Sequence, residues 1–270
     1  MSAVADDGLP ALLAQVEGHR GLALRCYKDK CLRRRLAVRM RARAVHTFAE
    51  YAALLGRMPE EYDLLVAALA INVTRFLRNP ETFAVLRERV LEPLWLRGGP
   101  IRIWSAGCAS GEEPYTLALL LHEIAGDRGV AVRSRVRIDA TDMDPGALDE
   151  LRRATYLPPA VEDLPPELLA AHFSPGPPYR LAPPVASCVR PLLHDLTRDL
   201  APEPPYDLIV CRNVVIYFDR VMQERLFAQF TDALAPGGHL LLGKVEALFG
   251  AARGRLVLED ARERLYRRPV

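Results

Sequence analysis

The chemistry of this chain centres on a turn of small residues that follows an apolar stretch and precedes a helix. Residues 101–106 predict a buried strand, and Gly107, Ala109 and Gly111 alternate through the turn after it. Small side chains let the backbone approach a ligand closely, and the amides that open the helix can face its polar groups. This pattern is typical of a nucleoside site. In the dinucleotide-binding fingerprint G-x-G-x-x-G/A, the third small residue would fall on Glu112. A glutamate at this position disfavours NAD as the ligand and favours S-adenosylmethionine.

Two acids follow the next predicted strand, residues 136–141. Asp142 and Asp144 come directly after it, and an acid in this place accepts hydrogen bonds from ribose hydroxyls. The alternative is a helix cap, because Asp144 precedes Pro145 and proline is favoured at the first helical position. We assign ribose binding to Asp142 and capping to Asp144.

The composition is that of a globular protein, with 270 residues, half of them apolar, and a net charge of +2. The five cysteines form no CxxC pair and the six histidines show no ligand spacing, so we expect no metal and a reducing, cytoplasmic setting. We expect neither a secretory leader nor an apolar run long enough to cross a bilayer.

Positive charge gathers in one helical stretch near the N-terminus. Between Arg20 and Arg43 the chain has ten Lys or Arg residues against a single acid, Asp29. Such a stretch suits an acidic partner, either nucleic-acid phosphates or an acidic protein helix. Tyr27 is the one interleaved aromatic, and no NPPY-like base-flipping motif occurs. The protein partner is therefore favoured.

The order of the predicted elements divides the chain into two domains. Residues 1–95 show helical periodicity and form an N-terminal all-helical domain that contains the basic helix and a linker helix. Residues 96–270 alternate strands and helices, which predicts an α/β domain with a parallel sheet and an antiparallel edge pair. The proline-rich region holds a small hairpin-like insert at about 173–188. Strands are expected at 101–106, 136–141, 188–192, 207–211 and 239–243, and helices at 114–125, 146–154, 165–173 and 220–234.

Three segments together resemble the chemotaxis-receptor glutamate methyltransferases of bacteria, the CheR type. NVTRFLR at Asn72–Arg78 resembles the family's NxTxFFR motif, SAGCASGEEPYTLA resembles its cofactor turn, and CRNVVIYFDR at Cys211–Arg220 is nearly its signature. Three motifs in the right order within a helical-plus-α/β layout are highly specific. The chain departs from the family at Leu77, commonly Phe, and at Gly243–Glu246, where the family has a GHSE-like run. The resemblance implies a class I, Rossmann-like S-adenosylmethionine methyltransferase sheet.

The resemblance also implies a reaction, in which a methyl group passes from S-adenosylmethionine to glutamate side chains on the cytoplasmic helices of chemoreceptors. The product is S-adenosylhomocysteine. We expect a cytoplasmic monomer that does not insert into the membrane or bind nucleic acid. The family's second active-site arginine is left unassigned among Arg87, Arg89 and Arg97.

The implied site residues fall into three groups. Tyr217 and Arg78 are the catalytic candidates. Arg34, Arg35 and Arg39 of the basic helix are the candidates for substrate binding. The candidates for cofactor binding are Asn72, Thr74, Arg78, Gly107, Glu113, Asp142, Asp195, Leu196, Asn213 and Val214.

The chemistry of a glutamate acceptor fits these side chains. Glutamate is already an anion at neutral pH, so no general base is required. Tyr217 can donate a hydrogen bond to one carboxylate oxygen, and Arg78 can supply positive potential for the acceptor or for the carboxylate of the cofactor. The alternatives are a buried aromatic at Tyr217 and a surface ion pair between Arg78 and Glu81.

Two other functions stay open. One is methylation of RNA or of another protein. The other is a non-catalytic, cofactor-binding regulatory domain, for which the altered residues Lys244 and Val245 are the main support.

Overall fold

Two compact units make up the chain in this computed structural model, which describes residues 8–70, 72–126 and 129–270. The first unit is Met1–Ile71 with Tyr217–Gln223, and the second is Asn72–Ile216 with Glu224–Val270. Within the first unit, the segment Tyr217–Gln223 is joined to the N-terminal residues by backbone contacts. Tyr27 and Phe218 form an antiparallel bridge with their rings 4.9 Å apart, and the Lys28 amide donates to the Tyr217 carbonyl at 2.9 Å.

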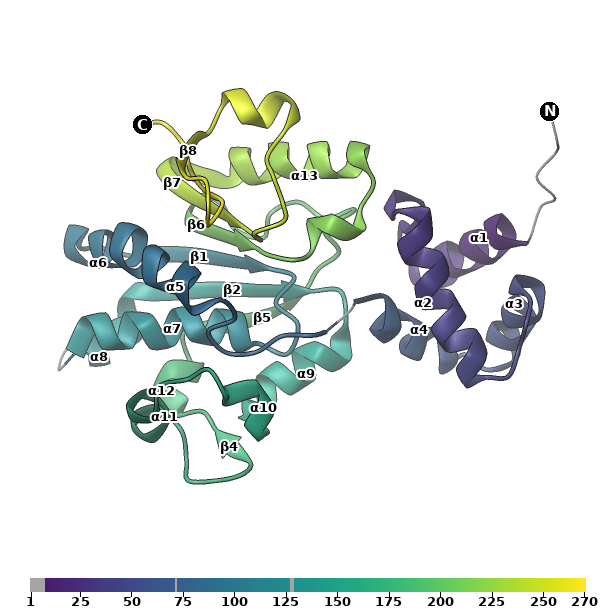
Figure 1. Ribbon diagram of the computed structural model, residues 1–270, viewed down its shortest axis with the longest axis horizontal. Coiled ribbons are helices and arrows are strands. Elements are labelled where there is room, and N and C mark those ends of the chain that lie inside the picture. The colour runs from purple at the N-terminus through teal and green to yellow at the C-terminus, as the bar shows by residue number, and fades with distance from the viewer. Residues whose placement is uncertain (1–7, 71, 127–128) are drawn as a thin grey trace. The chain divides into compact units, whose positions relative to one another are not determined.

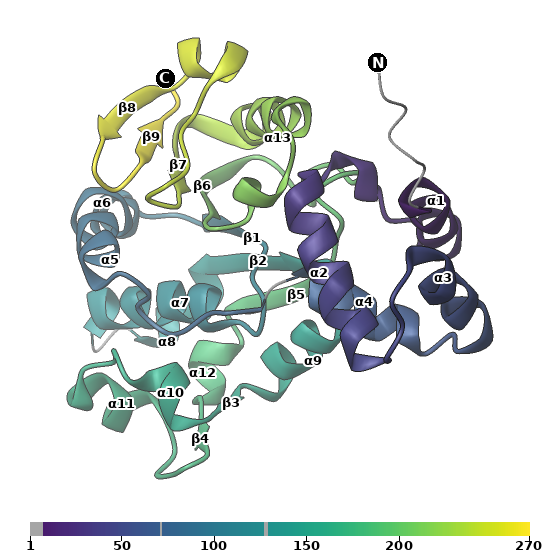
Figure 2. The same cartoon turned by 45° about the vertical axis from the view of Figure 1, so that its right-hand side comes forward.

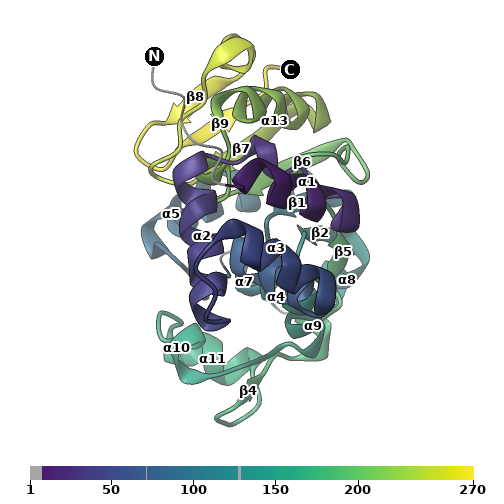
Figure 3. The same ribbon diagram turned by 90° about the vertical axis from the view of Figure 1, so that its right-hand side faces the viewer.

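Apart from the Tyr27–Phe218 bridge, the regular secondary structure among the described residues of the first unit is helical (Figure 3). Its N-terminal part forms α1 (Leu9–Arg20), η1 (Leu24–Cys26), α2 (Asp29–Ala42), α3 (Phe48–Arg57) and α4 (Glu61–Ala70). In α2 the buried residues are Leu32, Leu36 and Met40, whose spacing of four places them on one helix face. A capping box begins α3, in which the Thr47 side chain accepts from the Glu50 amide at 3.1 Å.

Residues 80–97 pack in the second unit, whereas residues up to 95 were expected above in the N-terminal helical domain. They form α5 (Pro80–Leu86), the π-helical turn η2 (Arg87–Leu91) and α6 (Glu92–Arg97). Phe83 and Trp95 are buried in the same apolar cluster as Ile103 of the sheet. The apolar face of this segment is therefore covered by the sheet domain.

Among the described residues, the centre of the second unit is a mixed seven-stranded sheet with the strand order β5-β2-β1-β6-β7-β9-β8 (Figure 1). The strands from β5 to β7 are parallel, and β9 runs antiparallel to β7 and β8. Strand order reverses between β1 and β6, and parallel sheets bind ligands at the carboxyl ends beside such a point. The strands are β1 (Ile101–Ala106), β2 (Val136–Asp142), β5 (Val189–Leu193), β6 (Tyr206–Cys211), β7 (Leu234–Leu242), β8 (Val257–Asp260) and β9 (Leu265–Arg267).

Helices cover this sheet. They are α7 (Glu112–Ala125), α8 (Gly129–Arg135), α9 (Pro145–Arg153) and α13 (Arg220–Ala233). Figures 1 and 2 show α7 and α13 on opposite sides of the strands, as in other sheets with helices on both faces. The expected α/β class with an antiparallel edge pair is confirmed, and the strand predicted at 101–106 coincides with β1.

The proline-rich insert is small and partly helical. Phe173 and Leu181 form an antiparallel bridge, so this segment turns back on itself as the expected hairpin-like insert does. Tyr179 also pairs with Tyr156. The insert region contains β3 (Thr155–Tyr156), α10 (Pro158–Val161), α11 (Pro166–His172), β4 (Tyr179–Arg180) and α12 (Pro183–Ala186).

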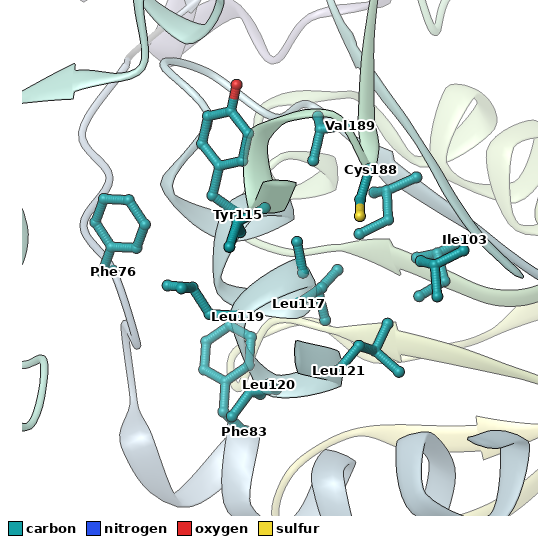
Figure 4. Packing of buried hydrophobic residues seen from close by; sticks show 14 of the residues in the cluster. Phe76, Phe83, Ile103, Tyr115, Leu117, Leu119, Leu120, Leu121, Cys188 and Val189 are labelled. Atoms are coloured by element: carbon teal, nitrogen blue, oxygen red, sulfur yellow. The ribbon is translucent and has the colours of Figure 1, made fainter. Parts of the chain in front are cut away.

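The core around α7 fixes the loop that carries the segment NVTRFLR, Asn72–Arg78. Figure 4 shows Phe76 and Phe83 beside the buried leucines of α7. The Phe76 ring packs edge-on against Tyr156 and Phe173, with centroids 4.8 and 5.4 Å away. The Leu77 amide donates to Oγ1 of Thr116 at 3.1 Å. Apolar burial and this hydrogen bond together hold the loop against α7.

Candidate functional site

The turn after β1 requires glycine at two positions. Gly107 has φ +82°, and a Cβ there would lie 2.4 Å from Cγ2 of Val214. Gly111 has φ +98°, and a Cβ there would lie 2.6 Å from Cγ of Leu151. Both the left-handed backbone and the close approach exclude larger residues. The turn leads directly into α7, whose N-terminal end carries partial positive charge.

Asp142 ends β2 and contacts this turn. Its Oδ2 accepts from the Ala109 amide at 2.9 Å and its Oδ1 from the Asp144 amide at 3.0 Å. Burial raises the pKa of Asp142, and the backbone hydrogen bonds oppose that rise. The Met143 amide also bonds to this carboxylate. An ionised carboxylate has about four acceptor positions, so about one remains for a ribose hydroxyl.

Asp144 caps α9, as predicted. Its Oδ1 accepts from the Gly146 amide at 2.9 Å, and its Oδ2 accepts from Nδ2 of Asn72 at 2.6 Å. Within the described residues, Oδ1 of Asn72 is buried and has no hydrogen-bond partner. A buried acceptor without a donor is unfavourable. The site therefore fits a ligand that brings a donor, such as the ammonium group of S-adenosylmethionine.

Thr74 and Arg78 lie on the same loop as Asn72. Thr74 is half-buried. Nη1 of Arg78 donates to the Val73 carbonyl at 3.0 Å. The alternative pair with Glu81 is not formed, because Glu81 binds Lys244 instead. Across the described part of the chain Arg78 has no ion pair, which suits a residue that receives an anion.

Arg212 is the functional candidate that the sequence analysis missed. Its side chain is 2% exposed, and Nη1 lies 3.4 Å from Oε2 of Glu113. Nη2 donates to the Arg78 carbonyl at 2.8 Å and to Oδ1 of Asn79 at 2.9 Å. Burial raises the pKa of Glu113, while Arg212 and the Ser105 hydroxyl, which donates at 2.9 Å, oppose that rise. Arg212 belongs to the segment CRNVVIYFDR, and it thus connects Glu113 of the segment SAGCASGEEPYTLA with the loop that carries NVTRFLR.

Arg87, Arg89 and Arg97 have partners elsewhere. Arg87 pairs with Glu92 on the surface, and Arg89 lies 3.6 Å from Asp260 beside the edge strands. Arg97 pairs with Asp207 at the start of β6, whereas Arg212 follows the end of that strand. The signal for Arg212 was its place inside CRNVVIYFDR, directly after a predicted strand.

The loop after β6 carries three of the predicted site residues. Asn213 adopts φ +60°, and Val214 packs over Gly107. Tyr217 ends the 3₁₀ turn η4 (Val215–Tyr217), is half-exposed and clusters with the first unit. Val214 therefore contacts the cofactor turn, Asn213 directly precedes Val214, and Tyr217 follows them along the chain.

Asp195 and Leu196 lie just beyond β5, at the same edge as Asp142. The His194 amide donates to the Asp142 carbonyl at 2.9 Å, which brings the segment to the end of β2. Oδ1 of Asp195 accepts from the Thr197 amide and hydroxyl at 2.9 and 2.7 Å. These contacts place the segment after β5 beside the end of β2, and ligand binding by Asp195 and Leu196 stays a prediction.

The basic helix α2 presents its arginines in different ways. Arg34 is exposed, whereas Arg35 is half-buried and its Nε lacks a partner among the described residues. Arg39 binds Glu61 through two hydrogen bonds of 2.9 Å. Glu61 is fully buried and also accepts from Arg43 at 2.6 Å and from the Tyr51 hydroxyl at 2.9 Å. Arg39 thus lies in a structural network, while Arg34 faces solvent.

Three other features of the described residues bear on function. No three His, Cys, Asp or Glu side chains within them are placed to hold a metal ion. None of their helices is both long and apolar enough to cross a membrane. Cys108 is buried in the cofactor turn, and burial raises the pKa of its thiol, which disfavours a nucleophilic role.

Comparison with known proteins gives two family matches. The family model described as "CheR methyltransferase, SAM binding domain" matches residues 72–263, and "CheR methyltransferase, all-alpha domain" matches residues 7–70. "Chemotaxis protein methyltransferase 2" of Pseudomonas aeruginosa is 35% identical over 84% of this chain and 81% of its own length. "Chemotaxis protein methyltransferase" of Listeria innocua is 33% identical over 86% of this chain and 87% of its own length. An "Uncharacterized 104.1 kDa protein in hypE 3'region" of Rhodobacter capsulatus is 34% identical over 89% of this chain, which spans 25% of that protein.

Proposed function

Because this chain belongs to the CheR methyltransferase family, we propose that it transfers the methyl group of S-adenosylmethionine to glutamate side chains of a bacterial chemoreceptor. One observation carries the proposal: the loop 72–79 joins two halves of a site at the carboxyl ends of the parallel strands. Asn72 bonds to Asp144 beside Asp142, and Arg212 bonds to the Arg78 carbonyl and to the Asn79 side chain.

The residues present fit S-adenosylmethionine. Asp142 would accept from the ribose hydroxyls, and Asp195 and Leu196 would bind the adenine. Glu113 and the orphaned Oδ1 of Asn72 would accept from the ammonium group. When bound, the cofactor supplies an electrophilic methyl carbon on a sulfonium and becomes S-adenosylhomocysteine. The remaining contacts come from Thr74, Arg78, Gly107, Asn213 and Val214.

Positioning is the catalytic work of the protein, because the acceptor carboxylate is ionised near neutral pH. The Tyr217 hydroxyl would donate to one oxygen of the acceptor carboxylate and leave the other oxygen free to receive the methyl group. Arg78 supplies positive potential for the incoming anion. The guanidinium of Arg212 is held by Glu113, so it does not trap the acceptor in a strong ion pair.

The basic helix α2 supplies the receptor-binding surface. Arg34 is exposed and lies four residues from exposed Lys30 and seven from exposed Arg41, so the three side chains share one helical face. This face complements a glutamate-rich receptor helix. Arg35 borders it, and Arg39 supports it through Glu61. The enzyme acts as a cytoplasmic monomer on the cytoplasmic helices of its receptor.

A methylation assay tests the proposal. Purified protein is incubated with radiolabelled S-adenosylmethionine and either cytoplasmic receptor fragments, with and without their C-terminal tails, or total RNA. Label is expected in the receptor fragments and not in RNA, and Glu→Ala replacements at the labelled receptor sites should abolish it. Label in RNA alone would support the nucleic-acid alternative. Cofactor binding without transfer to any fragment would support a regulatory domain.

A further inference from the structure

A buried carboxylate after β7 gathers the backbone amides of two loops. Glu246 is 3% exposed. Its Oε2 accepts from the Gly243 amide at 2.6 Å and from the Asn213 amide at 3.1 Å, and its Oε1 accepts from the Ile216 amide at 3.4 Å. The Val214 amide also interacts with it. A cluster of amides of this kind is built to bind an anion, and here the anion is a side chain of the protein itself.

The loop 213–216 depends on this acceptor. Asn213 adopts the left-handed φ of +60°, which costs energy in a residue other than glycine. The close packing extends to Gly243, where a Cβ would lie 2.7 Å from Oε2 of Glu246 and 2.9 Å from the Asn213 amide nitrogen. Without the carboxylate, several amides would lose their buried acceptor at once.

The loop that Glu246 holds connects the residues that carry the chemistry. Arg212 precedes it and pairs with Glu113, and Tyr217 follows it. Between them, Val214 packs against Gly107 of the cofactor turn. A shift of this loop would therefore move Arg212, Val214 and Tyr217.

We propose that Glu246 is a positioning residue, whose ionised carboxylate holds the loop from Arg212 to Tyr217 in the conformation required for methyl transfer. The proposal rests on the proposed function of the site. Burial raises the pKa of Glu246 and the backbone amides oppose that rise. The amides of Gly243, Asn213 and Ile216 all donate to its two oxygens, an arrangement that favours the ionised form, which only accepts. The carboxylate does not contact substrate itself but acts through the loop.

The test compares Glu246→Gln and Glu246→Asp with a matched control, Asp139→Asn. Asp139 is another buried carboxylate of the sheet domain, but it is bound by Arg190 and by the Tyr206 hydroxyl, each at 2.9 Å. In Glu246→Gln, one carboxylate oxygen is replaced by an NH2 group. This group is a hydrogen-bond donor, and it faces backbone N–H groups that are donors as well. The substitution should lower kcat by about a hundredfold, the effect of a displacement near 1 Å, with a smaller change in receptor KM. Glu246→Asp keeps the charge with a shorter reach and should retain more activity than Glu246→Gln.

Hydrogen exchange gives a readout independent of methyl transfer. The amides of Asn213, Ile216 and Gly243 should be protected in the unaltered protein and exchange faster in Glu246→Gln, but not in Asp139→Asn. Unchanged exchange at these amides, or a kcat loss in Glu246→Gln no larger than in Asp139→Asn, would overturn the positioning role. If Glu246→Gln does not fold, Glu246→Asp is judged by the same two measurements. If the unaltered protein methylates no receptor, the proposed function fails, and exchange alone decides whether Glu246 holds the loop.

Discussion

Replacement of Asp142 by alanine should weaken binding of S-adenosylhomocysteine by removing its ribose contacts. The carboxylate oxygens already accept from the amides of Ala109, Asp144 and Met143, which leaves about one of the roughly four acceptor positions of the carboxylate for the ribose. A hydrogen bond to a charged group contributes about 1.5–3 kcal/mol. The ribose hydroxyls regain water when the carboxylate is lost, so we expect a net loss of about 1–3 kcal/mol, or roughly 5- to 150-fold in Kd.

Calorimetry with two ligands separates ribose binding from support of the turn. Asp142→Ala also leaves the Ala109 and Asp144 amides without their acceptor, which could loosen the turn for any ligand. The matched ligand is 2′,3′-dideoxy S-adenosylhomocysteine, which lacks the hydroxyls. The mutation should weaken the binding of S-adenosylhomocysteine and have little effect on the binding of the dideoxy ligand. An equal loss for both ligands would refute the ribose assignment.

Three further predictions concern the helical unit and the acceptor. Hydrogen bonds from Arg39, Arg43 and Tyr51 outweigh the effect of burial and lower the pKa of Glu61 below its ordinary 4.5. Its stabilising contribution should therefore be complete above about pH 4.5 and be lost as the pH falls below that value. Glu61→Gln should lower the unfolding free energy at pH 7 by about 3 kcal/mol in urea titrations followed by circular dichroism, and an unchanged midpoint would contradict this network. The double variant Arg34→Ala/Arg41→Ala should raise the receptor KM, as added salt should, and leave cofactor affinity intact. Arg39→Ala should also lower the stability of the protein. Equal stability of the two variants would argue against the assignment of Arg39 to a structural network and of Arg34 to the exposed face of α2. Tyr217→Phe should slow single-turnover transfer by roughly tenfold to a thousandfold without loss of cofactor affinity, and an unaltered rate would remove Tyr217 from the site.

Much of the fold was predictable because the signals are local. An apolar stretch that leads into a turn of small residues located β1, and the Asp144-Pro145 pair located the start of α9, since a capping side chain bonds within its own turn. The cofactor turn was also evident, because the close approaches at Gly107 and Gly111 allow only glycine.

The missed features depend on contacts between residues distant in sequence. Arg212 and Glu113 are 99 residues apart, and only the alignment of β1 with β6 brings them together. Arg39 was assigned to substrate binding with Arg34, but Glu61, 22 residues further along, binds it. Charge pattern locates a basic helix but does not say which arginines a buried acid from another helix will bind.

The chemical nature of the acceptor is tested most directly by the pH dependence of transfer together with the stability of the product. Single-turnover rates are measured with cofactor and receptor fragment saturating, and the labelled product is then exposed to mild alkali. A glutamate acceptor predicts a rate nearly flat from about pH 6 to 8.5 and label released as volatile methanol. A rate that rises about tenfold per pH unit, with label stable in alkali, would indicate an amine acceptor such as lysine and contradict the account.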